Sequence, residues 1–442
     1  MRRSLLALGA SIAVIAGACT GGGTPAPSLA SPGESPAVQS PGATGESPAA
    51  TEGASAAPSF DSSAVSGTVK LSGWQSSDAE KQALQDTIAA FEAQNSKITV
   101  DYSVIAGDYP TVMATNFASR NVPDLFYVDA AFGQTWANQG FLLPLDDYIS
   151  ASGFDTSTFF PGYIQPFKGS DGKIYGLPKD GNTIGMAYNT TDVTTAPTTM
   201  DELQTTAQGL KGKDGLKAPM CLNASLDRGL AFIIADGGAI VSADGTQNMT
   251  NTPETTTAVQ DYLNLFKNGL GMTASDMGDG WCGDSLGKKH AAIAFEGGWL
   301  DPAMSSTFPD VKYTWGTFPQ GTSGKPSTIS FTAAYSIGAD SQNKDQAWVL
   351  LEYLAGIDGM TKWTSGGVAL PSRSDVPTPQ GKEVLVQQAP NAQPGSGFMK
   401  GFTDVQDAFN KAFLTEVQKK TFQAGPVIQA TSAAVDKALA GS

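Results

Sequence analysis

The sequence predicts an α/β protein of two lobes, each a sheet flanked by helices, because strand-like and helix-like segments alternate along most of the chain. At 442 residues the chain is too long for one compact core, and this length suits two lobes. The run DLFYV at 124–128 is continuously apolar, as a parallel strand buried on both faces should be. These observations favour the α/β class over an all-helical or all-strand fold.

The individual elements follow from the spacing of apolar residues. In the expected strands apolar and polar residues alternate, and in the expected helices apolar residues recur three or four positions apart. Ser77 and Glu80 have the spacing of a capping box at the start of the first helix. The expected strands are 69–74, 98–104, 124–128, 291–295 and 331–339, and the expected helices are 83–91, 109–119, 254–266 and 344–354.

The N-terminal residues have the features of an export signal. Two arginines precede an apolar stretch at 5–18 that is too short to span a bilayer comfortably. The small residues before Cys19 resemble a bacterial lipobox, in which the cysteine becomes the lipidated N-terminus. We expect a signal peptide at 1–18 and a lipid anchor on Cys19, at the extracellular face of the cell membrane or in the periplasm. An ordinary signal peptide, with Cys19 incidental, is the alternative.

The segment 19–66 is expected to be a disordered tether. After Cys19 it consists almost only of Gly, Pro, Ala, Ser, Thr and Glu, and Phe60 is its only aromatic residue. Such a composition cannot bury enough apolar surface to offset the entropy lost on ordering.

Charge and composition exclude several classes of function. The formal net charge is −15, from 27 basic and 42 acidic residues, so the surface repels nucleic-acid phosphates and no nucleic acid is expected as a partner. The single histidine, His290, argues against a histidine-rich zinc site and against Ser-His or Cys-His catalysis. The sequence contains no P-loop, GxGxxG fingerprint or metal-ligand cluster, so we expect no cofactor and no metal.

Two cysteines remain once Cys19 is assigned to lipidation. Cys221 and Cys282 should pair in an oxidising compartment and would brace the segment that carries Trp281. Two buried free thiols are the alternative.

Four segments carry a resemblance to a known family. The first contains a Pro-Asp motif before the buried strand, and the second is the extended run GLPKDGNTIGMAYN, which suits a crossing between lobes. The third contains the turn EGGW, and the fourth has an Asn-Lys-x-x-Ala-Trp helix and a Pro-Ser-Arg loop. Together they resemble family 1 extracellular solute-binding proteins, the maltose-binding-protein-like sugar receptors of ABC importers. The segments are 123–149, 171–189, 281–300 and 331–373, within a match from about 68 to 442.

This resemblance implies a two-lobed periplasmic-binding-protein-like fold whose lobes are joined by a multi-strand hinge and close on a ligand in the cleft. It implies that lobe 1 is 67–180 plus 331–357 and that lobe 2 is 184–327 plus 362–442. It also implies a sugar ligand, with an oligosaccharide favoured, the membrane subunits of an ABC importer as partners, and a monomer.

Candidate ligand contacts in the first lobe follow from what a sugar requires. Its CH-rich faces need aromatic side chains, and its hydroxyls need planar hydrogen-bonding groups. Trp74 and Asp129 follow strands at the edge where α/β sheets bind ligands. Lys179, Asp180 and Asn182 lie at the crossing between the lobes. The alternatives are helix capping for the first two and a salt bridge within the hinge for the others.

A second group of candidates surrounds the EGGW turn. Trp281 and Trp299 near Glu296 fit stacking on a sugar and binding of its hydroxyls, and two adjacent glycines suit a turn that exposes its neighbours. Core packing is the alternative for these aromatic residues. Tyr335 in the return strand and Arg373 in the Pro-Ser-Arg loop complete the set, with an ion pair between lobes as the alternative for Arg373. The tryptophans expected in the core are Trp315, Trp348 and Trp363.

Two other classes of function stay open. An extracellular carbohydrate-active enzyme would need paired carboxylates, for which Asp180 and Glu296 are the candidates. The family that the segments resemble is non-catalytic, so we expect no enzyme activity. The other class binds a different solute in the same fold, such as a polyol or a glycerol phosphate ester. Lys179 and Arg373 are the only cations among the candidates, which disfavours an anionic ligand.

Overall fold

The computed structural model describes residues 59–75, 78–367 and 369–441 of the chain. The expected signal peptide at 1–18, the lipidated Cys19, the linker as far as residue 58 and Ser77 of the capping box lie outside the described residues. Within the described part, no helix combines the length and apolar character that a membrane span requires.

The last residues of the expected linker belong to the fold, which corrects its expected end at residue 66. Phe60 packs edge-on against Tyr148, with ring centroids 5.6 Å apart, and its backbone N–H donates to the carbonyl of Ala151 at 3.0 Å. A 3-10 helix, Ser62–Ala64, follows and is capped by the side chain of Asp61. The single aromatic residue in an otherwise small and polar segment anchors the end of that segment.

The first sheet has the strand order β11-β10-β3-β1-β2, and β4 also pairs with β10. Strand β1 runs parallel to β2 and β3, whereas β10 is antiparallel to β3 and β4. The strands are β1 (Gly67–Gly73), β2 (Ile98–Val104), β3 (Leu125–Asp129), β4 (Leu177–Thr183), β10 (Thr328–Ile337) and β11 (Ala392–Pro394).

Helices cover this first sheet and bury its apolar side chains. Helix α11 packs on β1 and β10, α3 packs on β3 and β10, and α1 contacts α11 and α12. Trp348 of α11 is fully buried, as expected. The helices are α1 (Asp78–Gln94), α2 (Tyr109–Ser119), α3 (Ala130–Asn138), α4 (Asp146–Ser152), α5 (Pro161–Ile164), η2 (Gln165–Phe167), α11 (Lys344–Ala355) and α12 (Ile357–Thr364).

The second sheet has the strand order β7-β6-β8-β5-β9. Strands β6, β7 and β8 are parallel to one another, and β5 is antiparallel to β8 and β9. Every residue of β5, β6 and β8 is buried. The strands are β5 (Gly185–Asn189), β6 (Ala218–Cys221), β7 (Gly271–Met272), β8 (Ala291–Glu296) and β9 (Tyr313–Gly316).

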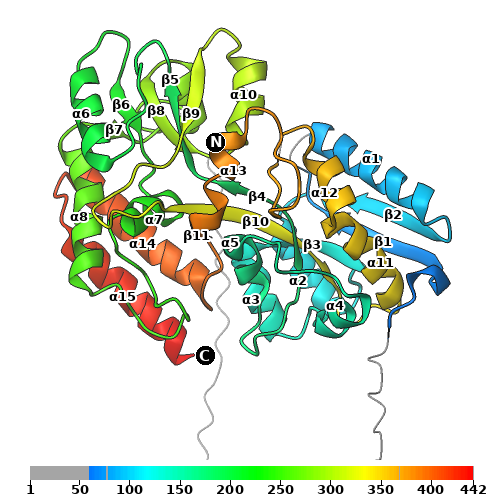
Figure 1. Cartoon of the computed structure of the whole chain (residues 1–442). Helices are drawn as coiled ribbons and strands as arrows, with labels where there is room; N and C mark the ends of the chain where they lie inside the picture. The colour runs from blue at the N-terminus through cyan, green and yellow to red at the C-terminus, as the bar shows by residue number, and fades with distance from the viewer. Residues whose placement is uncertain (1–58, 76–77, 368, 442) are drawn as a thin grey trace, which may run out of the picture. The chain divides into compact units, whose positions relative to one another are not determined.

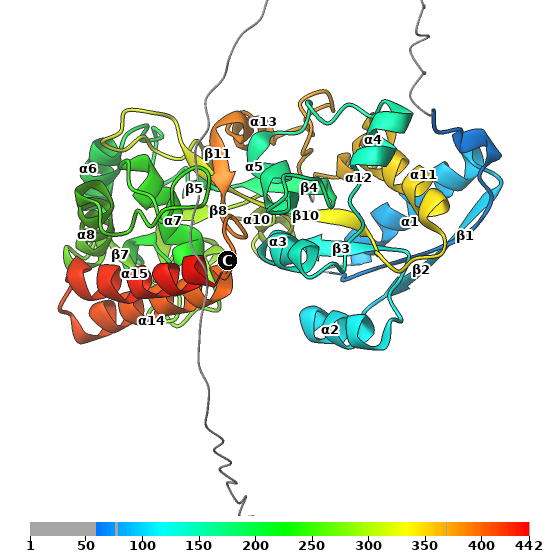
Figure 2. The ribbon, with the colours of Figure 1, turned by 90° about the horizontal axis from the view of Figure 1, so that it is seen from below.

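The helices of the second lobe surround this second sheet. Helix α6 packs on β6, α9 packs on β6 and β8, and the long helices α14 and α15 lie side by side against α8 (Figures 1 and 2). The helices are α6 (Met200–Leu210), α7 (Leu226–Ala235), α8 (Pro253–Lys267), α9 (Cys282–Gly287), α10 (Leu300–Thr307), α13 (Glu383–Val386), η3 (Ala389–Asn391), α14 (Phe402–Lys419) and α15 (Ala424–Ala440).

Strands β4 and β10 connect the two sheets. They pair with each other in the first sheet, and only Ile184 separates β4 from β5 in the second. The extended run at 176–189 is therefore a crossing between the lobes, as expected. The strands and helices predicted from periodicity are present, with ends that differ by a few residues: β10, for example, begins at Thr328 rather than at residue 331.

The hydrophobic cores indicate one adjustment to the proposed lobe ranges. Trp363, Ala369 and Val376 are buried in the core of the first lobe together with α1 and α11. The sequence analysis placed everything from residue 362 onward in the second lobe. Helix α12 instead carries the chain across the first lobe, because its apolar side chains are buried there.

Candidate functional site

The structure gathers most of the predicted site residues in two clusters that β4 and β10 join. The first cluster surrounds Lys179 and Asp180 on β4. The second surrounds Glu296 at the end of β8 and Trp299 in the turn after it. The contacts of Trp281 and Arg373 are described separately below.

In the first cluster the ammonium group of Lys179 is buried and paired. Lys179 is 3% exposed, and its Nζ contacts the carboxylate of Asp180 and lies 3.8 Å from Glu80 Oε1. It also lies 4.3 Å from the ring centroid of Trp363, whose Nε1–H donates to Asp180 at 2.9 Å. The hinge salt bridge considered as an alternative is therefore present, and Trp363, expected only in the core, contacts both of its members.

Aromatic rings form the rest of the first cluster. Trp74 is half-buried and packs edge-on against Tyr109 and Tyr127, with ring centroids 5.0 and 5.1 Å apart. Tyr335 packs edge-on against Tyr127 and is 1% exposed, so its ring belongs to the core. Of the two aromatic residues predicted for this cluster, Trp74 is partly exposed and Tyr335 is buried.

Asp129 acts as the N-cap of α3. Its carboxylate accepts from the backbone N–H of Ala131 at 2.8 Å, and the side chain is half-buried. Burial raises the pKa of Asp129, and the hydrogen bond from Ala131 opposes that rise. Asp129 thus caps a helix, which was the alternative to ligand binding, and its side chain remains partly exposed to solvent.

The second cluster is built around a buried carboxylate. Glu296 is 3% exposed and accepts hydrogen bonds from Trp299 Nε1 at 2.9 Å and from Arg228 Nη2 at 3.3 Å. Burial raises the pKa of Glu296, and the neighbouring guanidinium lowers it in part. A Cβ on Gly297 would lie 2.5 Å from the indole of Trp299, so the first glycine of the turn is required for the ring to fold back onto Glu296.

Arg228, on α7, is the site residue that the sequence analysis missed. Its guanidinium lies 5.1 Å from the ring centroid of Trp299 and 4.8 Å from that of Phe331 on β10. It also pairs with Asp227 at 3.1 Å. A signal for it exists, because Asp227 and Arg228 are the only charged residues of the apolar helix LDRGLAFIIA.

Asn182 joins the two clusters. Its side-chain oxygen accepts from the backbone N–H of Gly298 at 2.9 Å, and it is paired with Phe331 in the register of β4 and β10. Residues opposite each other in an antiparallel pair face the same side. Asn182 and Phe331 therefore both face the EGGW turn.

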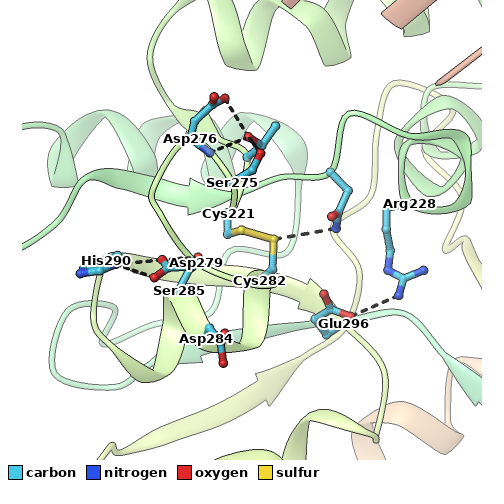
Figure 3. The surroundings of a disulfide bond; sticks show 12 residues. Cys221, Arg228, Ser275, Asp276, Asp279, Cys282, Asp284, Ser285, His290 and Glu296 are labelled. Carbon is cyan, nitrogen blue, oxygen red and sulfur yellow. Dashed lines mark hydrogen bonds and ion pairs between the residues drawn. A yellow bond between two sulfur atoms is a disulfide. The ribbon is translucent and has the colours of Figure 1, made fainter. Parts of the chain in front are cut away.

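Trp281 lies beside the disulfide, at the start of α9. Cys221 and Cys282 are bonded, with Cα atoms 5.4 Å apart, which confirms the expected pairing (Figure 3). Trp281 precedes Cys282 and is half-buried over the first turn of α9, where a Cβ on Gly283 would lie 2.3 Å from its ring. Trp281 thus contacts the first turn of α9, whereas Trp299 donates its Nε1–H to Glu296.

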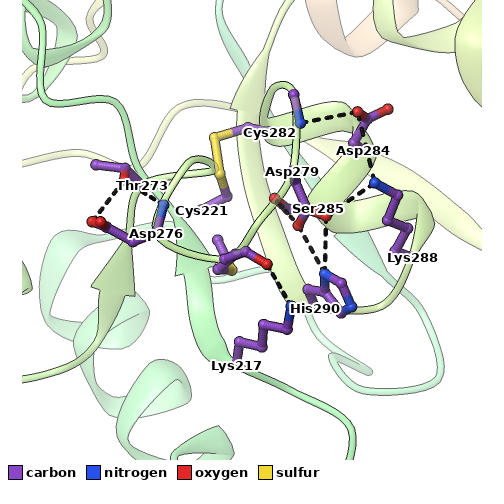
Figure 4. A network of polar contacts seen from close by, with 12 residues as sticks. Lys217, Cys221, Thr273, Asp276, Asp279, Cys282, Asp284, Ser285, Lys288 and His290 are labelled. Carbon is purple, nitrogen blue, oxygen red and sulfur yellow. Dashed lines mark hydrogen bonds and ion pairs between the residues drawn. A yellow bond between two sulfur atoms is a disulfide. The ribbon is translucent and has the colours of Figure 1, made fainter.

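A network of polar contacts holds α9 in place next to this disulfide (Figure 4). The buried carboxylate of Asp279 accepts from Ser285 at 2.8 Å and from Lys288 at 3.1 Å, and His290 Nδ1 lies 2.8 Å from it. Burial alone would raise the pKa of Asp279, but these hydrogen bonds outweigh it and lower the pKa to about 2.

We expect Asp279→Asn to lower the free energy of unfolding at pH 7 by roughly 1–2 kcal/mol, because a carboxylate with a lowered pKa stabilises the folded state above its ordinary pKa of 3.8. That stabilisation is lost as the pH falls from about 4 towards 2, so wild type and variant should converge there. Urea denaturation at pH 7, 4 and 2.5 measures the difference. A difference that does not change with pH would contradict this account.

Arg373 makes its contacts within the first lobe. It is 4% exposed, forms a bidentate pair with Asp375 at 2.8 and 2.7 Å, and lies over the rings of Phe154 and Phe159. Its partner is two residues away rather than in the other lobe, and no described contact links it to either cluster. The described residues contain no group of three or more His, Cys, Asp or Glu that could hold a metal ion.

Comparisons with known proteins place this geometry in a family. The model of the family described as bacterial extracellular solute-binding protein matches residues 75–361. A binding protein of Brucella abortus strain 2308 is 26% identical over 326 residues, which cover 70% of this chain and 77% of that protein.

Solved structures show the same fold. The cyclic alpha-maltosyl-1,6-maltose binding protein of Arthrobacter globiformis has a TM-score of 0.73 at 20% identity, over 86% of this chain and 100% of that chain. The GacH receptor of Streptomyces glaucescens, solved unliganded and with acarbose, has a TM-score of 0.72 at 21% identity, over 85% and 99%. An ABC substrate-binding protein of Listeria monocytogenes in complex with cycloalternan has a TM-score of 0.71 at 20% identity, over 85% and 100%.

The family and these neighbours are binding proteins. The fold matches the two-lobed α/β architecture that the sequence predicted. Because the family model covers residues 75–361, the chain belongs to the bacterial extracellular solute-binding proteins.

Proposed function

We propose that this protein is the solute receptor of an ABC importer and that it binds a sugar, with an oligosaccharide favoured, between its lobes. The observation that carries this proposal is the second cluster. There the indole of Trp299, the carboxylate of Glu296 and the guanidinium of Arg228 lie together. An aromatic face beside planar hydrogen-bonding groups fits the two kinds of surface that a sugar presents.

The names of the structural neighbours support the same ligand class. They describe receptors of cyclic alpha-maltosyl-1,6-maltose, acarbose and cycloalternan, and a further neighbour from Thermotoga lettingae is bound with alpha-D-tagatose. The first three ligands favour an oligosaccharide.

The charges of the site favour an uncharged ligand over a phosphate ester. Among the described residues of the two clusters, Lys179 is paired with Asp180, and Arg228 is paired with Asp227 and Glu296. An anionic ligand would have to compete with these carboxylates for both cations. A polyol in the same fold is the second candidate, because it offers hydroxyls without a phosphate.

In the proposed mechanism the ligand contacts residues of both lobes and therefore binds the closed form more tightly, which shifts the population towards it. The paired strands β4 and β10 carry Asp180, Asn182 and Phe331 between the two clusters and would form the hinge. The closed form is then recognised by the membrane subunits of the importer, and ATP on other chains of the importer supplies the energy of transport.

A thermal-shift screen of residues 59–442 against oligosaccharides, monosaccharides, polyols and phosphate esters tests the proposal. A ligand that binds the folded state alone raises the melting temperature by mass action. A rise with one class of sugar is expected. If the melting temperature rises only with polyols or phosphate esters, that compound class replaces sugars as the proposed ligand. If it rises with no compound, the ligand assignment is contradicted.

We also propose that cleavage after residue 18 and lipidation of Cys19 anchor the mature protein to the membrane. The lipobox-like residues before Cys19 and the family of the chain support this. Mass spectrometry of the mature N-terminus is the test. A diacylglycerol-modified Cys19 is expected, and an unmodified N-terminus would contradict the anchor.

A further inference from the structure

A cavity of about 690 Å³ lies between elements of the two lobes, away from both clusters of the candidate site. Its walls come from α5 and η2, from the last turns of α7, from β11 and from the loops at 237–243 and 323–327. Small-molecule sites in proteins have volumes of about 300–1,000 Å³. The cavity therefore has the size of a ligand site, and the proposed function does not use it.

Strands β4 and β10 separate this cavity from the candidate site. On β10, Ser330 Oγ donates to the carbonyls of Gly162 and Gln393, which line the cavity, whereas the next residue, Phe331, faces Trp299. Successive side chains of a strand point to opposite faces. The cavity and the candidate site thus lie on opposite faces of the crossing strands.

The geometry of α7 agrees with this separation. Leu230 and Ile234, one turn apart, line the cavity, and Arg228 of the same helix belongs to the candidate site. Arg228 precedes Leu230 by two positions, which places it about 200° round the helix. One helix therefore presents an apolar face to the cavity and a charged residue to the candidate site.

Two buried oxygens in the cavity wall lack partners. Gln165 Oε1 and Ser327 Oγ are both inaccessible to solvent and have no hydrogen-bond partner among the described residues. A buried polar atom without a partner is costly and calls for an explanation. Rotation of these two side chains towards the cavity would let a ligand donate hydroxyl hydrogens to both oxygens.

The remaining lining indicates what else the ligand must carry. Leu230, Ile234, Ile240 and Phe398 make much of the wall apolar. Among the lining residues Lys325 is the only charged one and is exposed, and none is a carboxylate, so nothing in the wall pairs with a cation. From these observations we infer that the cavity is a second ligand site, for an uncharged amphipathic molecule with a hydroxyl-bearing head and a short apolar tail.

Isothermal titration of the protein with octyl β-D-glucoside, below its micelle concentration, tests this inference. Saturable 1:1 binding is expected. Val241→Trp, which places an indole in the cavity wall, should weaken it at least tenfold. Ser327→Ala, which removes one hydroxyl and disturbs the fold less, should weaken it about 3- to 10-fold, the loss of one hydrogen bond.

Trp299→Ala distinguishes this site from the candidate site, because the same glucoside also carries a sugar. It should leave binding of the glucoside unchanged, whatever happens to the sugar identified by the thermal-shift screen. The inference is overturned if the wild type shows no saturable binding, or if both cavity variants bind as the wild type does. Loss of binding in Trp299→Ala with retention in the cavity variants would also overturn it, since the glucoside would then occupy the candidate site.

Discussion

Replacing Cys221 and Cys282 together with serine is expected to lower the free energy of unfolding by about 4 kcal/mol. The two residues are 61 positions apart, and a cross-link that closes so long a loop removes much of the conformational entropy of the unfolded chain. The bond also ties the end of β6 to the start of α9 inside the core, where the cysteines are 1% and 0% exposed. Chemical denaturation of the wild type, with its disulfide intact, and of the double serine variant measures the loss.

The wild-type protein unfolded and refolded in a reductant is the matched control, because it should show the same loss without any substitution. A reductant added to the native protein should act slowly, since both sulfur-bearing residues are buried. A loss below about 1 kcal/mol would show that the unfolded chain is already compact across this loop, because the entropic account assumes that it is extended.

The second large effect is expected on ligand affinity. Trp299→Ala should weaken binding of the sugar by about 1.5–3 kcal/mol, roughly 10- to 150-fold in the dissociation constant, because it removes the half-buried aromatic face of the second cluster. It also leaves Glu296 with one hydrogen bond fewer. Isothermal titration with the sugar identified by the thermal-shift screen measures the change.

Trp299→Phe is the graded control, because it keeps an aromatic face and loses the Nε1–H that Glu296 accepts. Its affinity should fall between those of wild type and Trp299→Ala. Unchanged affinity of Trp299→Ala, with an unchanged melting temperature, would remove Trp299 from the site. Trp281→Ala tests the other tryptophan of the sequence prediction. A loss of sugar affinity comparable to that of Trp299→Ala would extend the site to α9, as the sequence analysis expected.

Local patterns account for what the sequence predicted correctly. Alternation and helical spacing depend on residues near one another in the chain, so helix α2 was predicted at its observed bounds of 109–119. The buried strand predicted at 124–128 is β3 at 125–129, and the extended crossing predicted at 176–189 contains β4 and β5. The disulfide was predicted because only two cysteines remained to pair.

Long-range packing explains where the sequence analysis differed from the structure. The apolar residues of α12 fit either core, and only the three-dimensional packing places Trp363 beside Lys179 in the first lobe. Phe60 was expected in a disordered tether, because the residues near it in the sequence do not indicate that its ring packs against Tyr148.

The sequence by itself determined the α/β class, the order of the elements, the cysteine pairing and the residues of the EGGW turn, because each depends on residue type and local spacing. Only the tertiary structure decided which partner each charged or aromatic side chain takes. It brought Arg228 to Glu296 from 68 positions away and placed Trp363 beside Lys179. The physical reason is that a side chain's partner is set by burial and contact between segments far apart in the chain, and local spacing carries no record of those contacts.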